Sequence, residues 1–100
     1  MITRQIYPNV PPECQVSGFI YEASDVQRLG EDMVDVVLPN GILVTAGWFP
    51  DGCAAGKYRV SVYRGYDQLI SPLESACADD AARNVEQVVS QFIYKTTCAS

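Results

Sequence analysis

The sequence predicts an α+β fold: an antiparallel β-meander of four to five strands, packed on one face by a C-terminal amphipathic helix. Two observations carry this prediction. Along residues 33–64, apolar residues alternate with polar ones or flank turn residues, as they do in antiparallel strands. After residue 77, apolar residues recur at intervals of three and four, which is the spacing of a helix with one buried face. We assign residues 1–16 to an extended N-terminal arm and residues 17–100 to a single α+β domain.

The N-terminal arm is predicted from its prolines. Pro8, Pro11 and Pro12 remove backbone donors and disfavour helix at the residues before them. Such an arm is either disordered or lies across a partner subunit. A first strand is predicted over residues 18–23. Residues 24–29 are then expected to form one helical turn, with a longer strand as the alternative.

The strongest local signal is a hairpin over residues 33–49. Pro39, Asn40 and Gly41 separate two apolar runs and suit the successive positions of a three-residue loop. This loop makes Leu38 face Ile42. The apolar face predicted from it comprises Val34, Val36, Leu38, Ile42, Val44, Ala46 and Trp48. A two-residue Asn-Gly loop is the alternative, but it divides the apolar residues less cleanly between the two faces.

The next strand is predicted over Lys57–Arg64, where Tyr58, Val60 and Val62 alternate with polar residues. A turn at residues 65–67 leads into a short returning strand over residues 68–71, ended by Pro72.

The C-terminal helix is predicted over residues 78–94. Its apolar stripe comprises Ala81, Ala82, Val85, Val88, Val89, Phe92 and Ile93. Asp79 is the expected N-cap, and Cys77 is expected to be a small buried residue. The stripe should cover the sheet face that bears Val36, Val44 and Val60.

The net charge restricts the partners. Seven basic and twelve acidic side chains give −5, which repels nucleic-acid phosphates and anionic lipids and suits a basic protein partner. No apolar run reaches the length of a signal peptide or a membrane span. We therefore expect a cytoplasmic protein that does not bind membranes.

The four cysteines are expected to be free thiols in a reducing compartment. None of them lies in a Cys-x-x-Cys pair, so the usual zinc spacing is absent. A disulfide between Cys14 and Cys98 is the alternative if the protein is exported.

Catalytic machinery is not visible in the sequence. The absence of histidine excludes Ser-His-Asp and Cys-His catalysis. Residues 52–57 resemble a phosphate-binding loop, but a strand follows them where such a loop needs a helix. Asp35 lies mid-strand, where a charge on the solvated sheet face is the favoured interpretation. We predict no enzyme activity, no cofactor and no metal.

A second apolar patch is predicted on the sheet face turned away from the helix. It comprises Met33, Val37, Leu43, Phe49 and Tyr63. One helix covers only one face, so the N-terminal arm or a second subunit must cover the other. Exposed patches of this kind often mark interfaces, and these five residues are the candidate interface of a homo-oligomer or of a complex with another protein.

The order strand, strand, strand, helix in residues 42–92 is similar to compact DNA-binding domains that insert a three-stranded sheet into a groove. That resemblance implies Lys57, Arg59 and Arg64 as the nucleic-acid contacts. The acidic total charge opposes this alternative.

In size and style, with the hairpin VLPNGILVTAGWFPDG, the chain also resembles orphan proteins of bacterial mobile elements such as integron gene cassettes. The leading functional hypothesis is a non-catalytic binding or interaction module that self-associates. A nucleic-acid-binding domain and a small acidic inhibitor or immunity protein are the alternatives.

Overall fold

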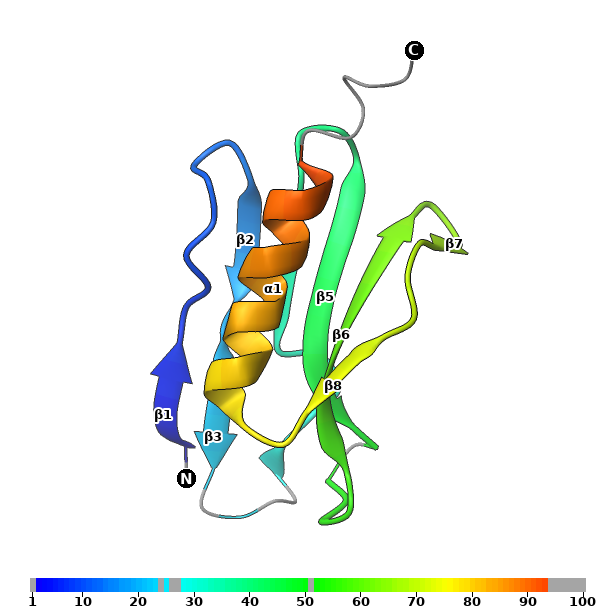
Figure 1. Ribbon diagram of the computed structural model, residues 1–100. Coiled ribbons are helices and arrows are strands. Elements are labelled where there is room, and N and C mark those ends of the chain that lie inside the picture. The colour runs from blue at the N-terminus through cyan, green and yellow to red at the C-terminus, as the bar shows by residue number, and fades with distance from the viewer. Residues whose placement is uncertain (1, 24, 26–27, 51, 94–100) are drawn as a thin grey trace.

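The computed structural model describes residues 2–23, 25, 28–50 and 52–93. Eight strands and one helix follow one another in this part of the chain (Figure 1). They are β1 (Ile2–Ile6), β2 (Gln15–Gly18), β3 (Ile20–Ala23), β4 (Val34–Val37), β5 (Ile42–Phe49), β6 (Lys57–Arg64), β7 (Asp67–Gln68), β8 (Leu73–Ser75) and α1 (Ala78–Phe92).

The strands form two antiparallel sheets. The larger sheet has the order β2-β4-β5-β6-β7, and β8 also pairs with β6. The smaller sheet consists of β1 and β3. An α+β fold with an antiparallel sheet packed against one C-terminal helix is therefore confirmed. The described residues hold more strands than expected, because β1 lies in the predicted arm and two short strands share the neighbour β6.

The central hairpin has the predicted three-residue loop. Val34 pairs with Ala46, and Val36 with Val44. The amide of Leu38 donates to the carbonyl of Ile42 at 2.9 Å. Gly41 has φ +86°, which is the left-handed region that glycine enters without a steric cost. The register thus places the apolar residues of both strands on one face, as the sequence pattern requires.

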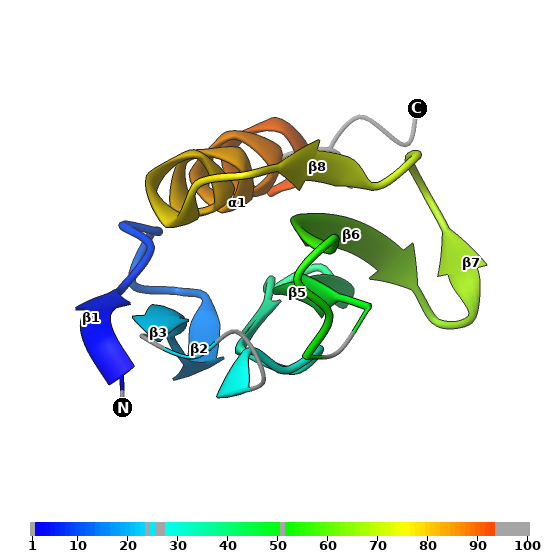
Figure 2. The same cartoon turned by 90° about the horizontal axis from the view of Figure 1, so that it is seen from below.

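Helix α1 covers one face of the sheets, which we call the core face (Figures 1 and 2). It contacts β1, β3, β5, β6 and β8. The predicted stripe is buried, and so are the sheet residues that it was expected to meet, including Val36, Val44 and Val60. Tyr58 lies among them, and its hydroxyl donates to the carbonyl of Tyr21 at 2.9 Å. Burial raises the pKa of Tyr58 to about 12.

Two predictions at the start of the helix are wrong. The N-cap is Cys77 rather than Asp79, and no side chain caps the helix there. Cys77 is exposed, not buried. Asp79 lies within the first turn, where it accepts a hydrogen bond at 2.8 Å from Arg4. A carboxylate in the first turn interacts favourably with the helix dipole without capping the helix. An acidic residue near the start of a helix therefore fits the N-cap position or the first turn, and the sequence does not distinguish the two.

Residues 2–16, the described part of the predicted arm, are tied to the rest of the chain. Strand β1 pairs with β3, and Arg4 forms ion pairs with Glu22 and Asp79. Further along, the amide of Asn9 donates to Glu86 at 2.8 Å. These contacts dock this segment beside α1, at the border of the core face and away from the opposite face of the larger sheet.

The segment after β6 departs from the predicted strand over residues 68–71. Only Gln68 belongs to β7. The amide of Leu69 still donates to the carbonyl of Val62 at 2.8 Å, and residues 70–72 then arch away before β8 begins after Pro72. Pro72 has no amide to donate to β6, which accounts for the interruption. Of the helical turn predicted over residues 24–29, residues 24, 26 and 27 lie outside the described residues.

Candidate functional site: the outer face of the sheet

The face of the larger sheet that is turned away from α1 is called the outer face here. The register places Val37, Leu43 and Tyr63 side by side on it, in one row across β4, β5 and β6. Val37 is 40% exposed, and the other two side chains are half-buried. Their chain neighbours on the core face are buried, since successive side chains alternate between faces. No described element lies across this row (Figure 2).

Phe49 is also on the outer face but lies apart from this row. It is six residues from Leu43 along β5, which is roughly 20 Å in a strand. The guanidinium of Arg59 lies 5.1 Å from the centre of its ring. Arg59 also pairs with Glu74 at 2.9 Å. Phe49 therefore belongs to a small cation–π contact with local partners, and the apolar surface predicted from the sequence divides in two.

Met33 does not belong to the outer face. Its side chain is 5% exposed and lies in the core. The amide of Met33 donates to the carbonyl of Ala46, and Ala46 also pairs with Val34. Two residues of one strand thus oppose a single residue of the next, as in a β-bulge. The bulge breaks the alternation, so Met33 and Val34 both turn inward, and we exclude Met33 from the candidate interface.

The same bulge brings backbone over the outer face at Gly47. A Cβ at this position would collide with the carbonyl of Glu31, so only glycine fits. Glu31 and Asp32 are exposed at this place, on the β4 side of β5. The bulge therefore sets the backbone of two acidic residues at one border of the outer face, where the charge of Asp32 acts on Asp35.

A polar row follows the apolar row. Ser17, Asp35, Thr45 and Ser61 lie side by side across β2, β4, β5 and β6. Burial raises the pKa of Asp35, and the charge of Asp32 raises it further. Burial therefore destabilises the charged form of Asp35 on the outer face. The sequence pattern favoured a solvated charge at this position.

The three cations considered for nucleic-acid contact are not brought together. Lys57 and Arg59 lie on the outer face, whereas Arg64 pairs with Ile42 and points to the opposite face. Arg59 is already paired with Glu74. Only Lys57 and Arg59 therefore share a surface, and only Lys57 of these two forms no ion pair with the described residues.

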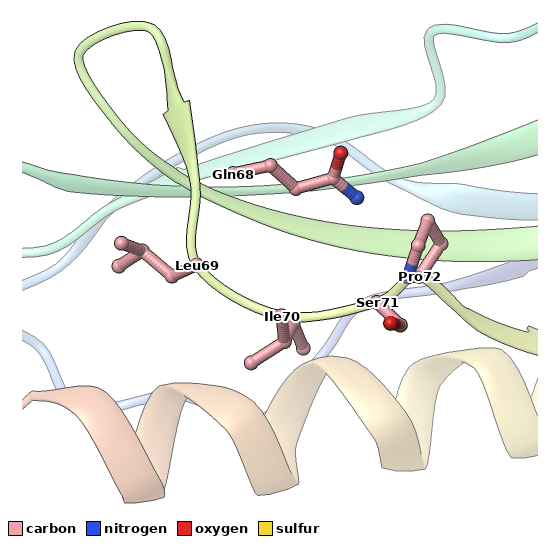
Figure 3. A pocket seen from close by; sticks show the side chains of 5 residues that line it. All are labelled: Gln68, Leu69, Ile70, Ser71 and Pro72. Carbon is pink, nitrogen blue, oxygen red and sulfur yellow. The ribbon is translucent and has the colours of Figure 1, made fainter.

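Two hollows lie near the sheet. One, of about 340 Å³, adjoins Val37 at the end of the apolar row and is bordered by Glu13, Gln15, Leu38, Pro39 and Gly41. The other, of about 400 Å³, lies under the arch of residues 68–72 (Figure 3). Gln68 lies along β6 there and Ile70 points toward α1. This second hollow is lined by one loop without a charged side chain, so we do not assign it a ligand.

The described residues contain no group of three histidine, cysteine or acidic side chains arranged to hold a metal ion. Nor does the helix they include have the length and apolarity to cross a membrane. Residues 52–56 lie in the loop between β5 and β6. The indole of Trp48, in β5, donates to the carbonyl of Cys53 in this loop at 2.8 Å. A strand follows, as predicted, so the loop faces no helix N-terminus.

Cys14, Cys53 and Cys77 carry free thiols. The alternative disulfide between Cys14 and Cys98 involves a residue outside the described ones. Cys14 is buried, and burial raises the pKa of its thiol, which disfavours the reactive thiolate.

No family model, curated protein or solved structure matches this chain. The resemblance to orphan proteins of mobile elements stays a prediction. Function is therefore inferred from the outer face, where Val37, Leu43 and Tyr63 were identified from the sequence. The bulge and the contacts of Arg59 were not, because neither leaves a periodic signal in the sequence.

Proposed function

We propose that this protein is a non-catalytic interaction module that associates with a second copy of itself through the outer face. The observation that carries the proposal is the row of Val37, Leu43 and Tyr63, which is apolar, partly exposed and uncovered by any described element. Face-to-face packing of two sheets is an ordinary way to bury such a row. A second copy fits because two-fold interfaces place the same patch on both partners.

The size of the face sets the expected strength. Strands β2, β4, β5 and β6 present a surface of roughly 20 by 20 Å, or about 400 Å² in projection, from standard strand spacings. Stable interfaces bury about 800 Å² on each partner. The outer face is therefore at the small end, and we expect a dissociation constant in the micromolar range.

The proposal is tested with two valines that differ in face but not in exposure. Val37 is 40% exposed on the outer face, and Val16 is 41% exposed on the neighbouring strand β2, with its side chain on the opposite face. Val37→Glu should dissociate the dimer, because a charge would be buried in a dry contact. Val16→Glu should leave it associated. Sedimentation velocity at matched concentrations measures both.

The pair separates association from folding, since both substitutions place the same charge at equally exposed strand positions. Equal loss of the dimer in both variants would overturn the outer face as the interface. An unsubstituted protein that stays monomeric would overturn self-association itself.

A further inference from the structure

Opposite charges flank β5 on the outer face at the level of Gly47, farther along the strand than the apolar row. On the β4 side, Asp32 lies close enough to Asp35 to raise its pKa, and Glu31 stands beside them at the bulge. On the β6 side are Lys57 and Arg59. Arg59 is paired with Glu74, whereas Lys57 is exposed and forms no ion pair with the described residues. One border of the face is therefore acidic and the other is basic, with β5 between them.

The acidic and basic groups also stand at the same level along β5. The carbonyl of Gly30 accepts from Trp48, and Glu31 lies over Gly47, so the bulge is level with residues 47 and 48. Across β5, Arg59 pairs with Gly47, and Lys57 with Phe49. A lysine side chain is long enough to bridge a difference of one or two positions.

Two orientations of a face-to-face dimer differ in which of these charged groups they bring together. An axis parallel to β5 exchanges the two sides, so the β4 border of each copy lies over the β6 border of the other. An axis in the plane of the sheet but perpendicular to the strands keeps β4 over β4. This second axis also reverses the direction along β5, so with the apolar rows in contact the bulge of one copy lies roughly 27 Å from the bulge of the other. The carboxylates of one copy then do not meet Lys57 of the other.

We propose that two copies pair about an axis parallel to β5, with Lys57 of each copy meeting the carboxylates of Glu31 and Asp32 of the other. This inference rests on the proposed function and adds the orientation of the partner. The contact occurs twice in the dimer by symmetry. The same axis sets Val37 of one copy near Tyr63 of the other, with Leu43 close to the axis.

Charge reversal tests the orientation. Asp32→Lys and Lys57→Asp should each raise the dissociation constant of the dimer at least about tenfold, because each creates two repulsive contacts. The double variant restores opposite charges and should return to within about threefold of the unsubstituted protein. Arg64→Asp is the control, since Arg64 is an exposed cation of the same strand on the opposite face. Arg64→Asp should leave the dissociation constant of the dimer nearly unchanged.

Sedimentation equilibrium on the full chain gives the five dissociation constants, and circular dichroism verifies that each variant keeps its helix. A double variant that binds no better than the single variants would overturn the proposed orientation. If the single variants associate normally while Val37→Glu dissociates, the orientation is wrong and the outer face remains the interface. A monomeric unsubstituted protein would overturn both proposals.

Discussion

Asn40 connects the central hairpin to the far end of the helix. Its side-chain amide donates to the carbonyl of Phe92 at 2.8 Å, while its side-chain oxygen accepts from the amide of Ile42 at 3.2 Å. The last carbonyls of a helix lack partners within the helix, so this contact satisfies one of them. Only the turn role of Asn40 is predictable from the sequence, because a contact with a residue 52 positions away leaves no local pattern.

The negative charge of Asp35 lowers the stability of the folded chain. Burial and the charge of Asp32 raise its pKa above the ordinary 3.8. The folded chain then binds the proton more tightly than the unfolded chain, so the stability linked to Asp35 falls as pH rises from 3.8 through the folded pKa. Asp35→Asn removes this loss. Its melting temperature should exceed that of the unsubstituted protein at pH 7, and the margin should shrink on acidification.

Thermal melts between about pH 3 and pH 7, at concentrations below association, measure this margin. Asp32→Asn is the second variant, because it removes the neighbouring charge and should reduce the margin produced by Asp35→Asn. A margin that stays constant over the whole pH range would show that Asp35 carries no such cost.

At the scale of elements, the hairpin, strand β6 and helix α1 were predictable because each carries a long periodic pattern. The strand bounds of β6 match the prediction at both ends. The helix begins at Ala78 as predicted and ends at Phe92, and the predicted last residue, 94, lies outside the described residues. Strands β1, β2 and β8 were not predicted. They are short, lie near prolines and form only because a neighbouring strand offers unpaired backbone groups.

Helix α1 carries the clearest test at this scale. Val88 is 2% exposed at the centre of its buried stripe. Val88→Asp should cost at least about 4 kcal/mol of unfolding free energy, because it buries an unpaired charge. A domain of this size has only about 5–15 kcal/mol in total, so the variant should be largely unfolded near room temperature or melt far below the unsubstituted protein.

Gln87→Asp is the matched control, since Gln87 is the exposed neighbour in the same helix. It introduces the same residue with the same helix propensity, at a cost of about 0.5 kcal/mol. Urea unfolding compares the two variants. Similar losses in both would mean that the helix does not bury the stripe.

At the scale of the whole molecule, the sheet has one covered face and one uncovered face. The sequence pattern was sufficient to predict which residues point away from the helix on β4, β5 and β6. It was not sufficient to predict how the face is divided, because the bulge at Met33 breaks the alternation and Arg59 covers Phe49. What remains is the row of Val37, Leu43 and Tyr63, with acidic and basic groups on the two sides of β5 farther along the strand, at the level of Gly47.

The molar mass of the unsubstituted protein tests the central claim most directly. Light scattering from about 1 to about 100 micromolar spans the range in which an interface of this size should form. The mass should rise from that of one chain, 11.0 kDa, toward that of two, and Leu43→Glu should hold it at one chain. A mass that stays at 11.0 kDa for the unsubstituted protein at the highest concentration would contradict self-association through the outer face.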